Sequence, residues 1–156
     1  MLKQLIEKIT EGSTIKIKGE AYKALTKTIY SPISDTSLTY VKIVLSGHDV
    51  LVIIPYLDFV CLGHVENIFG SGKVFPDSII YNEIEFTKLD EDYQIVRDLV
   101  FGDPMIAEGE VFYADYANEN SDISISLGLI SRTNERADIV QKVLSIEDVK
   151  VGEEND

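Results

Sequence analysis

The sequence predicts a mainly β domain, an antiparallel barrel or sandwich of about nine or ten short strands with a short N-terminal helix. Short apolar runs recur at spacings of about 8–12 residues between clusters of Gly, Pro, Asn and Asp. Residues 50–63 form a nearly continuous apolar run that is rich in β-branched and aromatic types. Apolar positions also alternate with small ones over residues 123–129. Both patterns are typical of strands that bury one or both faces.

The N-terminal residues predict a short amphipathic helix. Its apolar residues fall at helical spacing (Leu2, Leu5, Ile6, Ile9), and Gly12 follows as a stop signal. From residue 13 the period changes to two, because Ile15 and Ile17 alternate with lysines. We expect a second strand over residues 21–30 and a turn over residues 31–35.

The middle of the chain predicts paired strands. Residues 38–46 and 49–54 meet through Gly47-His48, which favours a two-residue type II′ hairpin. The apolar run at 50–63 is too short for a membrane helix, which needs about 18 residues, and Pro55 and Asp58 interrupt it. We expect two buried strands joined by a bend at residues 55–58, because proline is excluded from a central ladder.

The second half predicts further strands over residues 79–86, 93–101, 107–116 and 123–129, the first two separated by the acidic residues 89–92. Residues 136–145 fit a helix or a strand. A strand is favoured, and a helix there would make the fold α+β. No linker divides the chain, so we expect one domain over residues 1–151 and a frayed acidic tail over 152–156.

The charge is unevenly placed along the chain. The net charge is −13, yet residues 1–50 carry seven lysines against five acids, a net of +2. Residues 83–122 carry twelve acids against Lys88 and Arg97, a net of −10. Such a segment repels phosphate backbones and anionic membranes, so neither nucleic acid nor a membrane is an expected partner. A basic protein partner or a divalent cation would be attracted, although solvated strand faces alone also explain this composition.

Cysteine use and the N-terminal residues indicate a reducing, cytoplasmic location. Cys61 is the single cysteine, which excludes an intramolecular disulfide framework. Charges run through residues 1–8, where a signal peptide would have its apolar region.

The motifs that usually mark a cofactor or metal site are incomplete here. Residues 70–73 read Gly-Ser-Gly-Lys, but Asn67 and Val74 stand where a phosphate loop needs Gly and Ser or Thr. Three His or Cys residues in all are too few for structural zinc. The Asx-rich residues 115–122 lack the EF-hand pattern and predict a turn. We therefore expect no cofactor and no metal.

Residues 108–116 are the best candidate for a functional surface. On a regular strand Glu108, Glu110, Phe112 and Tyr116 share one face, while Tyr113 and Asp115 share the other with Val111. Gly109 suggests a bulge, which would change this assignment. An acidic rim beside aromatic anchors has the composition of a recognition surface.

Two functions follow as hypotheses. The first is a non-enzymatic interaction module whose acidic region at 83–122 meets a basic protein through Glu108, Glu110, Phe112, Tyr113, Asp115 and Tyr116. The alternative is a barrel that binds a small molecule or catalyses a reaction with His64, Glu108 and Glu110 as acid or base groups. The first is preferred because no nucleophile, base or metal set stands out, which argues against an enzyme. An exposed edge strand could also form a homodimer.

Overall fold

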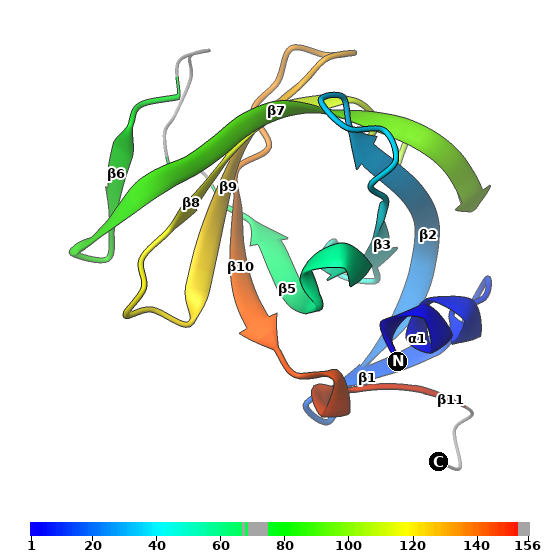
Figure 1. The fold of residues 1–156 in the computed structure, drawn as a ribbon. Coiled ribbons are helices and arrows are strands. Elements are labelled where there is room, and N and C mark those ends of the chain that lie inside the picture. The colour runs from blue at the N-terminus through cyan, green and yellow to red at the C-terminus, as the bar shows by residue number, and fades with distance from the viewer. Residues whose placement is uncertain (67, 69–74, 153–156) are drawn as a thin grey trace.

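A computed structural model, which describes residues 1–66, 68 and 75–152, shows a closed antiparallel barrel of eight strands (Figure 1). Around the ring the strands are β2 (Glu20–Pro32), β3 (Tyr40–Leu45), β4 (Val50–Ile54), β5 (Phe59–Val65), β10 (Ile139–Leu144), β9 (Ile123–Ile130), β8 (Val111–Ala117) and β7 (Ile84–Phe101). Pairing of β7 with β2 closes the ring. The barrel thus consists of two meanders, β2–β5 and β7–β10, joined along the β5–β10 and β2–β7 seams.

The outer face of β3, β4 and β5 is covered by the N-terminal helix and two added strands. These are α1 (Leu2–Lys8), β1 (Thr14–Ile17) and β11 (Val149–Gly152), and β11 follows the short helix η2 (Ile146–Asp148). The apolar face of α1 packs with outward-facing residues of the barrel wall such as Ile43 and Leu51, in the largest apolar core. Burial of this face stabilises a helix that would be too short to form alone.

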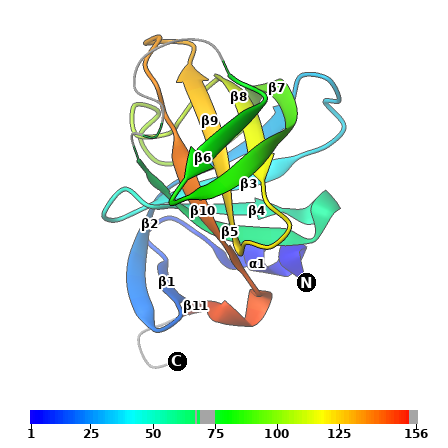
Figure 2. The same cartoon turned by 90° about the vertical axis from the view of Figure 1, so that its left-hand side faces the viewer.

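The opposite side of the barrel carries a second apolar core. Here β6 (Ser78–Tyr81) lies over the outer face of β8 and β9, as Figure 2 shows. Phe86, Tyr116 and Leu127 are fully buried in this core. The barrel wall therefore separates two apolar cores that lie outside the ring.

The inner face of the barrel consists of the alternate residues of the same strands, because successive side chains of a strand point to opposite faces. On β3, Val41, Ile43 and Leu45 belong to the outer core, so the side chains of Tyr40, Lys42 and Val44 point inward. A small apolar group formed by Val44, Val50, Val52 and Cys61 fills the inner side of β3–β5.

The wall of the barrel opposite this apolar group is polar inside. Asp92 pairs with Tyr113, and Asp115 pairs with Ser126, on the inner faces of β7, β8 and β9. Tyr113, Asp115 and Ser126 are all partly accessible although they lie in the middle of the wall. The site described below adjoins this accessible polar interior.

Most of the predicted architecture is confirmed. The chain is a mainly β barrel with a short N-terminal helix. Residues 139–144 form β10, so the strand favoured within 136–145 is present and the α+β alternative is not. The bend predicted at 55–58 is the 3-10 helix η1 (Pro55–Leu57) between β4 and β5.

Two local predictions were wrong. The acidic residues 89–92 do not separate two strands, because β7 runs through them without a break; the turn lies earlier, at Asn82 and Glu83, whose φ angles are 50° and 67°. Gly47 and His48 both have positive φ, 85° and 69°, whereas a type II′ turn has positive φ only at its first central residue. His48 takes up the left-handed conformation, and its N–H donates to the Leu45 carbonyl.

Residues 69–74, which include the Gly-Ser-Gly-Lys stretch, and residues 153–156 of the predicted tail lie outside the described residues. In the part of the chain that is described, no helix has the length and apolar character needed to cross a membrane.

Candidate functional site

A cavity of about 450 Å³ lies between β2, β7 and the segments that precede β8 and follow β9. Its walls are mainly apolar and include Val96 and Leu99 of β7 with Pro104 and Ala107. The polar residues of its lining are Thr28, Glu110, Ser131 and Arg132, and Gly109 completes it. This volume falls within the range of about 300–1,000 Å³ typical of small-molecule sites.

Arg132 holds one wall of the cavity in place. Its Nη1 donates to the Pro104 carbonyl at 2.9 Å, and its Nη2 donates to the carbonyls of Met105 and Ala107 at 3.2 and 3.1 Å. The segment from 104 to 107 has no strand partner, so this side chain supplies hydrogen bonds that a ladder would otherwise provide.

The hydroxyl of Thr28 is a buried polar group without a hydrogen bond. Thr28 is 1% exposed, and its Oγ1 has no partner within hydrogen-bond geometry in the described part of the chain. The Tyr30 hydroxyl lies near it, but the two hydroxyls do not meet hydrogen-bond geometry. Burying a hydroxyl without a partner costs about 1–3 kcal/mol, and a molecule the size of water does not reach this oxygen from the cavity either.

A charged network adjoins the cavity inside the barrel. Lys42 Nζ lies 2.7 Å from Glu108 Oε1, which also accepts from Gln94 Nε2 at 2.9 Å. Gln94 donates to the carbonyl of Gly109, a cavity residue, and accepts from the Tyr40 hydroxyl. Burial alone would lower the pKa of Lys42, but the charge and hydrogen bond of Glu108, together with Tyr30 and Asp115, raise it overall. Lys42 is therefore held in its charged form, and Gln94 adds a further hydrogen bond to the Glu108 carboxylate.

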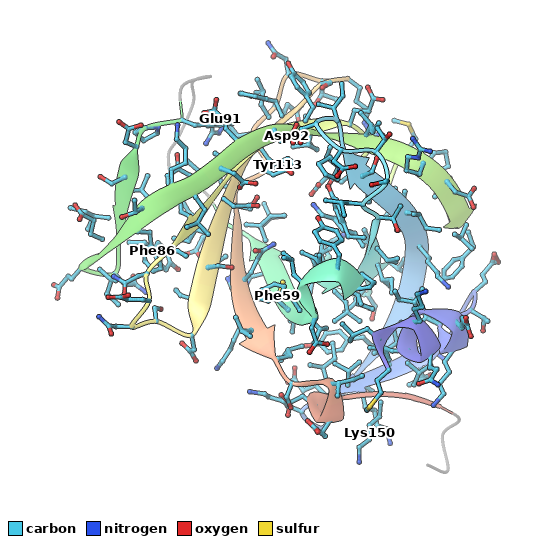
Figure 3. All side chains as sticks on the ribbon, in the orientation of Figure 1. Phe59, Phe86, Glu91, Asp92, Tyr113 and Lys150 are labelled. Carbon is cyan, nitrogen blue, oxygen red and sulfur yellow. The ribbon has the colours of Figure 1, made fainter. Side chains whose placement is uncertain are left out.

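A second polar group lies further along the inner face, toward η1. In Figure 3 Tyr113 and Phe59 lie on opposite sides of the ring, and Asp92 lies on β7 above Tyr113. Burial, and then the neighbouring Asp90 carboxylate, raises the pKa of Asp115 to about 6, although a hydrogen bond from Ser126 opposes this shift. Burial also raises the pKa of the Tyr113 hydroxyl.

The structure separates the residues that the sequence grouped at 108–116. Tyr113 and Asp115 point into the barrel, while Phe112 and Tyr116 point outward, as their alternation predicted. Tyr116 is fully buried, and its hydroxyl donates to the Pro76 carbonyl at 2.6 Å. Phe112 stacks on Phe75 at 5.1 Å between ring centroids. The aromatic residues of this group therefore do not form one exposed surface.

Glu108 and Glu110 precede β8 and differ from the regular-strand assignment. Gly109 has a φ of 76°, and this left-handed residue breaks the alternation between them. Glu108 reaches Lys42 inside the barrel, whereas Glu110 is exposed and lines the cavity. The two carboxylates are thus not a matched pair on one strand face.

His64 lies apart from both glutamates. It is at the end of β5, is 57% exposed, and its Nε2 is 3.4 Å from Glu66 Oε2. The same Glu66 oxygen accepts from the Tyr81 hydroxyl at 2.7 Å. His64 does not line the cavity, so it cannot serve Glu110 there as an acid or base.

Sequence reasoning missed Thr28, Lys42, Gln94 and Arg132. Lys42 left a signal, because it is a single charge within the apolar strand 40–45. The sequence around Gln94 and Arg132 gives no such signal, since the roles of these residues depend on contacts with distant segments. Among residues 1–66, 68 and 75–152, no group of three or more His, Cys, Asp or Glu side chains is placed to hold a metal ion.

Comparisons of the chain with protein-family models, with curated proteins and with solved structures found no match.

Proposed function

We propose that this protein binds a small molecule in the cavity beside β2 and β7. The observation that carries the proposal is a cavity of about 450 Å³ whose mainly apolar lining also holds the polar side chains of Glu110, Ser131 and Arg132. Apolar walls with a few polar groups are the usual composition of a ligand site.

Binding is favoured over catalysis by the state of the two glutamates. The Glu108 carboxylate is occupied by Lys42 and Gln94, so it is not poised to exchange a proton with a ligand. Glu110 lines the cavity beside Ser131, but no histidine and no second carboxylate among the described residues belong to the lining to complete a catalytic set. A single accessible carboxylate is better suited to recognising a ligand than to catalysing a reaction.

Binding can be tested with Nile red, a neutral dye whose fluorescence rises in apolar sites. We expect the wild-type protein to enhance its emission in a saturable way. Leu99→Trp should reduce the affinity at least tenfold, because the larger ring fills the cavity. The matched control is Val100→Trp, which adds the same ring at the next position of β7, a residue 44% exposed and absent from the cavity lining.

The outcome is read only for variants that melt cooperatively near the wild-type temperature. Ala107→Phe, a second cavity-filling change, replaces Leu99→Trp if that variant is unfolded. No saturable dye binding by the wild-type protein, or equal binding by both tryptophan variants, would contradict the proposal.

A basic protein partner is a second candidate function. It is supported by the acids at 83–122, because nine of the twelve are exposed: Glu83, Glu85, Asp90, Glu91, Asp98, Asp103, Glu110, Glu119 and Asp122. Neutralising Glu85, Glu91 and Asp98 should release a partner captured by the wild-type protein. Neutralising Glu7, Glu20 and Glu147 changes the net charge equally at other exposed positions and should not release it. Equal retention by both variants would count against this candidate.

A further inference from the structure

Resting on the proposed function, we infer that the ligand of the cavity is an organic amine, an apolar body whose ammonium group pairs with Glu110. The inference depends on the charges at the cavity rim and on the apolar walls behind them. Two charged side chains, Glu110 and Arg132, belong to the lining, so the sign of the ligand is decided by which of them is free to bind it.

The guanidinium of Arg132 is already engaged by the protein. Three backbone carbonyls accept its hydrogen bonds at 2.9–3.2 Å, and both donors of Nη2 are used. The negative ends of those carbonyl dipoles point at the guanidinium and offset part of its charge. Three of the five guanidinium donors are thus used, which leaves an anionic ligand only the Nε donor and the second Nη1 donor.

The carboxylate of Glu110 has no such partners. Within the described residues it takes part in no ion pair and no side-chain hydrogen bond, although Arg132 lines the same cavity. Its backbone is anchored, because the Glu110 carbonyl accepts from the Ser131 N–H at 3.0 Å. A fixed backbone with a free carboxylate is well suited to recognise a cation.

The net charge of the chain favours the same sign. Glu110 lies within residues 83–122, which carry a net charge of −10 in a chain of net charge −13. Such a field raises the local concentration of cations and their rate of association.

The interior of the cavity determines the rest of the ligand. Val96, Leu99 and Ala107 form apolar walls that match a hydrocarbon or aromatic body. The ligand class is therefore an amine with an apolar body, not a fatty acid or a phosphate ester.

The test is displacement of bound Nile red by octylamine, octanol and octanoate, which share one chain length, at pH 7.5 and 150 mM salt. We expect octylamine to compete at least tenfold better than octanoate and better than octanol. Glu110→Gln should remove the advantage of octylamine over octanol. Glu119→Gln, a matched change at an exposed acid outside the cavity lining, should preserve it.

Failure of the amine inference can be distinguished from failure of the proposed function. If octanoate competes best, if the three ligands compete equally, or if none displaces bound dye, the amine inference is overturned while small-molecule binding stands. An equal loss of the octylamine advantage in both glutamine variants would overturn it as well, because the general field would then be responsible. If Nile red itself does not bind the wild-type protein, the proposed function fails.

Discussion

Asp115 is a carboxyl group held inside the barrel, where its charged form is disfavoured. Its pKa is raised to about 6, from the ordinary value of 3.8, first by burial and then by Asp90. The folded protein therefore binds this proton more tightly than the unfolded chain, so stability falls as pH rises from about 4 to about 6. Above pH 6 the penalty is constant, and below pH 4 it is absent because both states are protonated.

We expect Asp115→Asn to stabilise the protein at pH 7.5 by about 1–3 kcal/mol and to have little effect near pH 3.5, since about 1.4 kcal/mol corresponds to one pKa unit. The measurement is the free energy of unfolding in urea at several pH values. Glu119→Gln, at an exposed position, is the control. A stabilisation that is the same at every pH would contradict the assignment.

Individual residues show how much of the site could be predicted from the sequence. Glu108, Glu110, Tyr113 and Asp115 stood out because carboxylates and aromatic residues are concentrated there, but their faces depended on Gly109. The left-handed backbone at Gly109 turns Glu108 toward the inside of the barrel, and the alternation of residues along a strand does not predict this turn. Thr28 could not have been predicted, because the sequence does not show which buried hydroxyl lacks a hydrogen-bond partner in the folded protein.

At the scale of elements, β7 joins the barrel and the second core in one long strand. It pairs with β6 and β8 in its first half and with β2 in its second, where two register shifts accommodate the curvature of the wall. Gly102 ends this strand against β2. A Cβ at Gly102 would lie 2.3 Å from the Leu25 carbonyl oxygen, so only glycine allows this approach.

We expect Gly102→Ala to destabilise the protein by about 2–5 kcal/mol, from a left-handed φ of 100° together with the backbone clash. Gly12→Ala is the matched control, because Gly12 also has positive φ, 77°, but open space where the methyl group would be. It should cost about 1 kcal/mol. Equal losses in urea unfolding would show that the approach to β2 contributes nothing.

For the whole molecule, alternation and turn residues were sufficient to predict a mainly β barrel or sandwich with an N-terminal helix. They could not decide between barrel and sandwich, because that depends on the β2–β7 and β5–β10 pairings between distant segments. The acidic residues 89–92 misled the prediction, since charge suggested a loop where β7 continues. In β7 some of the side chains that face the barrel interior are polar and accessible, so this strand lacks the alternation of apolar core residues and polar surface residues that usually marks a strand.

The two seams that close the barrel have a consequence for how the chain folds. Each meander can form from strands adjacent in sequence, but both seams join residues 62 to 84 positions apart, so closure costs more loop entropy than the hairpins within a meander and should follow them. Until then β2, β5, β7 and β10 are open edges able to pair with another chain. We therefore expect slow folding and a transient half-barrel that is prone to aggregate, a risk that the net charge of −13 reduces by repulsion between chains.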